Sequence, residues 1–115
     1  MGWLGELVCW RIRERDLHGI ELDASKVARA REFLPQADLR VGAATELPWP
    51  DASFRLVITS TLFTSILDLR VRRRVAQEVV RVMVPSGALL WYDFAFDNPR
   101  NPHVRGIAYT FPTRF

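Results

Sequence analysis

The sequence is poor in cysteine and lysine, and none of its hydrophobic runs is long. Its single cysteine, Cys9, cannot form a disulfide within one chain, and its apolar neighbours predict a packed thiol with no nucleophilic role. The longest apolar stretches, such as residues 56–69 and 87–92, are too short or too polar to cross a bilayer. No basic region precedes a long hydrophobic stretch at the N-terminus, so no signal peptide is indicated. We therefore expect a cytoplasmic protein with no membrane partner.

Lysine is also nearly absent, because Lys26 is the only one and arginine carries almost all of the positive charge. The arginines are scattered except for Arg70 and residues 72–74, and the net charge is only +3. Valines at positions 71, 75, 79 and 82 follow helical spacing through the same segment, which places the arginines on other faces of a helix. We interpret the arginine run as a solvated helix face and expect no nucleic-acid partner.

The 115 residues suit one domain, and 49% hydrophobic with 25% charged residues is typical of a globular protein. Strand-like and helix-like segments alternate, which is typical of parallel strands joined by helices. Asp23 and Ser25 offer side-chain oxygens to begin a helix that Pro35 ends. The expected elements are a helix over residues 3–12, a strand over 17–22, a helix over 24–34, strands over 39–41 and 54–59, a helix over 71–82, a turn over 85–87 and a strand over 88–94.

This order predicts an α/β fold with a Rossmann-like parallel sheet and helices on both faces. The continuous apolar run of residues 56–58 predicts a central strand covered on both faces. Ligands of such sheets bind beyond the carboxyl ends of the strands, where Glu21 lies. Its carboxylate suits the two hydroxyls of a ribose, although a carboxylate that merely ends a strand or caps the next helix is equally consistent with the sequence.

Three segments near the expected strand ends also stand in a recognisable order. The first is GIELDASKVARAR, which contains Glu21; the second is Gly42-Ala43-Ala44 followed by LPWPDASFR; the third is RVMVPSG at residues 81–87. In this order and spacing they resemble the class I S-adenosylmethionine-dependent methyltransferases, close to their small-molecule branch. The resemblance covers roughly residues 2–95, a partial methyltransferase domain, and leaves an irregular tail at 96–115.

The resemblance implies S-adenosylmethionine as the cofactor and a small molecule as the methyl acceptor. It assigns Gly2 to the end of the glycine-rich turn, Glu21 to the ribose hydroxyls, Leu22, Ala43 and Ala44 to the adenine, and Thr59 and Ser60 to the methionine part. Two positions depart from the family pattern. Ala43 stands where an aspartate usually accepts a hydrogen bond from the adenine amino group. Arg55 also replaces an aspartate, and if it is buried it needs a partner such as Asp38 or Asp51.

Compared with the family pattern, the first central strand, most of the glycine-rich turn and a C-terminal hairpin are missing. We therefore expect an incomplete sheet, in which the cofactor site needs completion and the chain alone is weak or inactive. The unpaired strand edges favour strand exchange or self-association into a homo-oligomer.

Three alternatives to methyl transfer stay open at this point. One is a non-catalytic α/β module completed by a partner strand, and another is a truncated remnant. The third is a nicotinamide-dependent oxidoreductase, because an acidic residue after a strand also serves dinucleotide binding. We assign no catalytic residue and no metal site. Asp93, Asp97, His103 and Tyr109 are candidates for a substrate site, but solvated side chains are the simpler interpretation.

Overall fold

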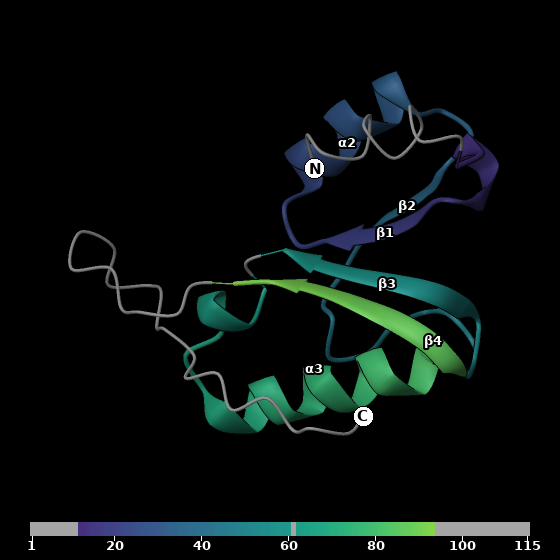
Figure 1. Cartoon of the computed structure of the whole chain (residues 1–115). Helices are drawn as coiled ribbons and strands as arrows, with labels where there is room; N and C mark the ends of the chain where they lie inside the picture. The colour runs from purple at the N-terminus through teal and green to yellow at the C-terminus, as the bar shows by residue number, and fades with distance from the viewer. Residues whose placement is uncertain (1–11, 61, 94–115) are drawn as a thin grey trace. The chain divides into compact units, whose positions relative to one another are not determined.

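A computed structural model describes residues 12–60 and 62–93, and Figure 1 shows the chain. The chain divides into two compact units, residues 1–47 and 48–115. The helix expected over residues 3–12, Cys9 and the tail beyond residue 93 lie outside the described residues. No helix in the described part of the chain is long and apolar enough to span a membrane.

The first unit consists of two parallel strands and the helix that connects them. After a short 3-10 helix, η1 (Glu14–Asp16), which the sequence did not predict, the elements are β1 (His18–Glu21), α2 (Ala24–Phe33) and β2 (Asp38–Val41). The two strands pair in parallel, with His18 opposite Asp38 and Glu21 opposite Val41. The expected strand, helix and strand are confirmed within two residues at each end.

Helix α2 begins and ends where its sequence predicts. The carboxylate of Asp23 accepts a hydrogen bond from the backbone of Ser25 at 2.9 Å, which caps the first turn. Val27 is fully buried in the core of this unit, together with leucines at positions 17, 34 and 39. The Arg31 side chain donates two hydrogen bonds, of 3.0 and 2.6 Å, to the carbonyl oxygen of Leu39 and so fixes α2 against β2.

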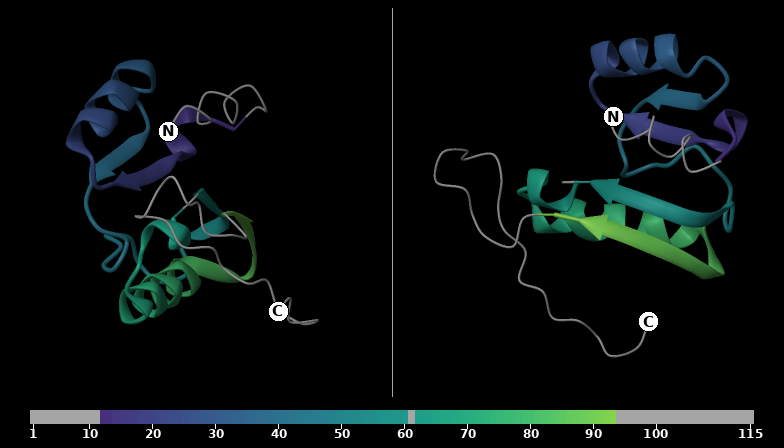
Figure 2. Two further views of the ribbon diagram at one scale, coloured as in Figure 1. Left: turned by 90° about the vertical axis from the view of Figure 1, so that its left-hand side faces the viewer. Right: turned by 45° about the horizontal axis from the view of Figure 1, so that its top comes forward.

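The second unit repeats the strand, helix, strand order. Its elements are β3 (Phe54–Ser60), η2 (Phe63–Ser65), α3 (Leu69–Val82) and β4 (Met83–Tyr92). Strands β3 and β4 pair in parallel, and Figure 2 shows α3 along one face of the pair. Val75, Val79 and Val82 are buried, and the fourth valine of the pattern, Val71, is at 36% exposure. The helical spacing of the valines therefore identified the packed face of α3.

The turn that was expected at residues 85–87 is wrong, because β4 runs through these residues from the end of α3. Met83 pairs with Phe54 and Ala88 pairs with Leu56, so β4 advances five residues where β3 advances two. The surplus residues form a bulge. A Cβ on Gly87 would lie 2.6 Å from Cγ of Met83, so the bulge needs glycine for a close approach, not for a turn.

The expectation that β3 is covered on both faces is also wrong for the described residues. Leu89 and Trp91 line a hollow together with residues of α3, so this face of the sheet points toward the helix. Leu90 alternates with them and is 55% exposed, and Leu56, which shares its side through the pairing of β3 with β4, is 46% exposed. Each sheet in the described residues contains two strands. The α/β class with parallel strands is confirmed, and these partial sheets fit an incomplete Rossmann-like fold.

Candidate functional site

The carboxyl ends of β1 and β2 bring four of the expected cofactor residues to one edge. The backbone N–H of Gly42 donates to the carbonyl oxygen of Glu21 at 3.0 Å. This hydrogen bond extends the pairing of β1 with β2 one residue beyond the last pair, Glu21 and Val41. Leu22 therefore lies next to the start of the 42–44 segment, because parallel neighbours end at the same edge. Within this unit, the structure brings Glu21, Leu22, Ala43 and Ala44 together.

The carboxylate of Glu21 is held by its own loop. The backbone N–H of Asp23 donates to Oε1 at 3.2 Å, and no described residue donates to Oε2. Asp23, and not Glu21, caps α2, since its carboxylate accepts from both the backbone and the hydroxyl of Ser25. The Ser25 hydroxyl and backbone N–H lower the pKa of Asp23 below its usual value. Glu21 is thus a strand-end carboxylate with one oxygen available for a ligand.

The residues beside Glu21 present a small apolar surface. Leu22 is 73% exposed, Ala43 is exposed and Ala44 is half-buried. Methyl groups next to a carboxylate suit a flat aromatic base joined to a sugar, with the base on the alanines and the sugar on the acid. Ala43 has no side-chain acceptor, so it cannot accept a hydrogen bond from an amino group on such a base.

The carboxyl end of β3 supplies only one exposed side chain of the two that were expected there. Thr59 is 4% exposed, and its Oγ1 has no hydrogen-bond partner among the described residues. It pairs with Trp91, so its side chain is on the face of α3. Ser60 is exposed and points to the other face. The Ser60 hydroxyl is thus open to solvent, while the Thr59 side chain lies in the core.

Asp93, immediately after β4, is a buried residue that joins two strand ends. Its Oδ2 accepts from the backbone N–H of Phe63 at 3.0 Å and from the indole N–H of Trp91 at 2.8 Å. The rings of Phe63 and Trp91 meet edge to face, with their centroids 5.6 Å apart. The interpretation of Asp93 as a solvated side chain is wrong, because the carboxylate holds η2 against the end of β4. Its position directly after a strand was the only sequence signal.

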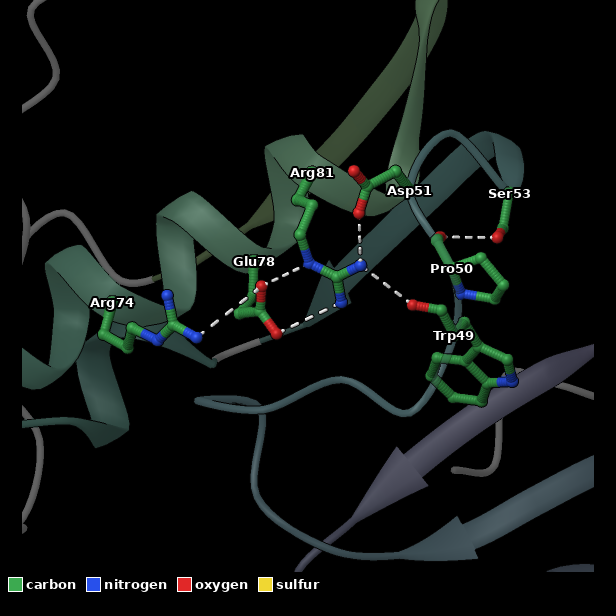
Figure 3. A network of polar contacts seen from close by, with 7 residues as sticks. All are labelled: Trp49, Pro50, Asp51, Ser53, Arg74, Glu78 and Arg81. Atoms are coloured by element: carbon green, nitrogen blue, oxygen red, sulfur yellow. Dashed lines mark hydrogen bonds and ion pairs between the residues drawn. The ribbon is translucent and has the colours of Figure 1, made fainter.

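Two of the family-like motifs meet in a polar network around Arg81, shown in Figure 3. Its guanidinium donates to both oxygens of Glu78, to the carboxylate of Asp51 at 2.8 Å and to the carbonyl oxygen of Trp49 at 3.0 Å. Glu78 is 3% exposed, and Arg74 approaches it at 4.0 Å. The carboxylates of Glu78 and Asp51 raise the pKa of Arg81, so it stays charged. Arg81 thus holds the end of α3 to the loop that precedes β3.

Arg55 needs no acidic partner, because the structure leaves it exposed. The two aspartates considered as its partners bind other arginines: Asp38 pairs with Arg40 at 2.8 Å and Asp51 with Arg81. Arg55 is therefore not the buried arginine that would have needed one of these aspartates. Gly2, Asp97, His103 and Tyr109 lie outside the described residues.

A family model described as "Methyltransferase domain" matches residues 1–87. A curated relative from Mycolicibacterium smegmatis, "Probable S-adenosylmethionine-dependent methyltransferase/", is 31% identical over 101 residues, which cover 81% of this chain and 38% of the relative.

Solved structures give the same fold. The PH0226 protein from Pyrococcus horikoshii OT3 has a TM-score of 0.63 at 25% identity, covering 69% of this chain and 39% of its own. The YcgJ protein from Bacillus subtilis has a TM-score of 0.62 at 25% identity, covering 76% of this chain and 44% of its own. The chain thus spans well under half the length of these relatives.

Proposed function

Because the chain belongs to the class I S-adenosylmethionine-dependent methyltransferases, we propose that its β1–β2 edge binds the nucleoside part of S-adenosylmethionine. The protein whose cofactor site includes this edge transfers the methyl group of S-adenosylmethionine to a small molecule.

Glu21 is the observation that supports the proposal most directly. Its carboxylate stands at the end of β1 with Oε1 oriented by the backbone of Asp23 and with Oε2 bonded to no described residue. A carboxylate accepts hydrogen bonds only, and the two hydroxyls of a ribose are two adjacent donors. Since Asp23 caps the helix, Glu21 is not needed for that purpose. The residues present fit the ribose.

The adenine would lie on Leu22, Ala43 and Ala44, which offer exposed or half-buried apolar atoms next to Glu21. The aspartate that the family usually has at position 43 is an alanine here. Losing one hydrogen bond costs about 0.5 to 1.5 kcal/mol, and tenfold in affinity corresponds to about 1.4 kcal/mol. We therefore expect cofactor binding several-fold weaker than in a relative that keeps the aspartate.

The chain's part in catalysis would be binding and orientation. The bound cofactor supplies an already reactive methyl group, and holding an acceptor in line with it provides much of the rate enhancement. Ser60 is the exposed hydroxyl at the end of β3 that is suited to the methionine part. We name no general base, and we propose that methyl transfer by these residues alone is weak or absent. The acceptor and a cytoplasmic location remain predictions.

The test is calorimetric titration of the chain with S-adenosylhomocysteine, with NAD as the comparison ligand. Glu21→Ala removes both hydroxyl contacts, and hydrogen bonds to a charged group contribute about 1.5 to 3 kcal/mol each. We expect the dissociation constant to rise at least tenfold in Glu21→Ala and less in Glu21→Gln. Glu32→Ala, which removes an exposed carboxylate on α2, is the matched control and should change nothing. Binding that is insensitive to Glu21→Ala, or binding of NAD alone, would contradict the proposal.

A second candidate is a non-catalytic module completed by a partner strand or a second copy. It is favoured by the pairing of the described strands, since each sheet has two strands and β1 and β3 each pair along one edge. Light scattering after size exclusion measures the mass of the chain in solution. A dimer that does not bind S-adenosylhomocysteine would favour this candidate, and a monomer that binds it would exclude a second copy as the completing strand.

A further inference from the structure

The apolar side chains at the β1–β2 edge contain no hydrogen-bond acceptor. Leu22, Ala43 and Ala44 end in methyl groups, and Leu22 and Ala43 are exposed. A Cβ on Gly42 would lie 3.0 Å from Cδ1 of Ile20, so the segment that begins with Gly42 lies close against β1. The two alanines follow directly from this close contact, and a base that lies on them meets methyl groups.

The backbone of Ala43 does not supply the acceptor that its side chain lacks. Its carbonyl oxygen already accepts a hydrogen bond from the backbone N–H of Glu46 at 3.3 Å, which closes a turn over residues 43–46. The backbone N–H groups of Ala43 and Ala44 donate to no described residue. This part of the edge thus presents donors, whereas the amino group at the 6-position of adenine is itself a donor.

Glu46 is the one acidic side chain in this turn, and it is not oriented as Glu21 is. Its side chain is exposed and makes no hydrogen bond or ion pair with a described residue. In contrast, the backbone N–H of Asp23 holds Oε1 of Glu21 at 3.2 Å. Binding a base through Glu46 would cost the rotamer freedom of a long side chain and the hydration of its carboxylate. Glu46 is therefore a poorer acceptor than an oriented carboxylate.

The exposure of Ala43 determines what happens to an amino group placed beside it. Such a group stays in contact with water, because Ala43 is exposed. Removing the group then changes the free and the bound ligand alike, so the affinity changes little. A site that hydrogen-bonds a polar group rejects ligands without it by about 10⁴-fold or more, whereas an apolar surface distinguishes similar shapes poorly. Toward the 6-position of a purine, the β1–β2 edge is an apolar surface.

We infer that the β1–β2 edge recognises the ribose and the flat apolar shape of a purine but not the amino group at its 6-position. Ala43 is the specificity-determining residue, because its methyl group leaves the amino group to water. The ligand class is that of purine nucleoside thioethers of homocysteine, with or without the amino group of adenine. This inference rests on the proposed function, since Glu21 must hold the ribose.

The experiment is calorimetric titration with S-adenosylhomocysteine and with its 6-deamino analogue, in which hydrogen replaces the amino group of the purine. We expect the native chain to bind the two with dissociation constants within about threefold of each other. Ala43→Asp should bind S-adenosylhomocysteine about tenfold tighter than the analogue, because only the amino group can donate to the new carboxylate. Ala28→Asp, the same change at an exposed position on α2, should keep the native ratio.

Circular dichroism verifies that each variant is folded, and Ala43→Asn, whose amide oxygen also accepts, gives a second reading if Ala43→Asp does not fold. A native preference for S-adenosylhomocysteine of about tenfold or more, with binding still weakened by Glu21→Ala, overturns the inference and leaves the proposed function standing. Loss of that preference in Glu46→Ala would assign the acceptor to Glu46.

An unchanged ratio in both variants at position 43 also overturns the inference, because the side chain there would not face the 6-position. Failure of the native chain to bind either ligand overturns the inference together with the proposed function. Binding of both ligands that is insensitive to Glu21→Ala has the same consequence, since the ribose would then not be held by that carboxylate.

Discussion

Asp93→Ala is expected to destabilise the second unit, because one carboxylate oxygen receives two hydrogen bonds there. Oδ2 of Asp93 accepts from the backbone N–H of Phe63 at 3.0 Å and from the indole N–H of Trp91 at 2.8 Å. Asp93 is 9% exposed and Phe63 is 8% exposed. Truncation to alanine leaves a buried backbone donor without this acceptor and releases η2 from the end of β4.

The size of the effect follows from the burial of the two donors. An unsatisfied buried donor costs about 1 to 3 kcal/mol. The Phe63 amide is buried and should contribute about 2 kcal/mol on that scale, whereas Trp91 is 39% exposed, so its indole N–H can bond to water. We therefore expect a loss of about 2 to 3 kcal/mol in the free energy of unfolding for Asp93→Ala. Asp93→Asn keeps an oxygen acceptor without its charge and should lose about 1 kcal/mol.

Urea unfolding followed by circular dichroism measures these differences, and amide exchange of Phe63 localises them. A slope near 1 to 2 kcal/mol per molar urea would convert the alanine effect into a midpoint shift of about 1 to 3 M. Asp16→Ala is the control, since among the described residues that exposed carboxylate pairs only with Arg13, in an exposed salt bridge, and its loss should cost under about 0.5 kcal/mol. Asp93 does not hold η2 if Asp93→Ala costs no more than Asp16→Ala, or if the Phe63 amide exchanges at the native rate.

Two further predictions concern the backbone and pH. Ala52 has a positive φ of 51°, where a Cβ costs about 1 to 2 kcal/mol, so Ala52→Gly should stabilise by about 0.5 to 1 kcal/mol in urea unfolding. Ala28→Gly in the exposed face of α2 should destabilise by about 1 kcal/mol instead, and the same sign for both would contradict the argument. The lowered pKa of Asp23 stabilises the fold above the unfolded value of 3.8, and this contribution is lost as pH falls through the lower folded pKa. Melting temperatures measured between about pH 5 and pH 2 should therefore fall less steeply in Asp23→Asn, and an unchanged slope would exclude Asp23 as the source.

Local sequence patterns predicted much of the fold. The cap at Asp23, the stop at Pro35 and the valine spacing of α3 depend on interactions within one or two turns, so the sequence contains them directly. Local patterns did not predict the beginning of β4. Its bulge is set by the pairing of Met83 and Ala88 with β3, a contact between residues about thirty positions apart.

The features of the candidate site also fall into two groups, those that local sequence patterns predicted and those that depend on tertiary packing. The order of the motifs identified the family and placed Glu21 at a strand end, because a strand followed by a capped helix is a local pattern. That Thr59 is buried and that Asp93 binds Phe63 depend on which side chains the packed chain brings together.

The sequence by itself determined the fold class, the family and most of the elements, since hydrophobic spacing and capping act over a few residues. Only the tertiary structure decided what the single arginine of the RVMVPSG motif does. Arg81 meets Asp51 from a distant motif and buried Glu78 from its own helix, and this convergence requires the loop and α3 to be packed. Burial and long-range pairing are properties of the assembled core, so residue order alone does not contain them.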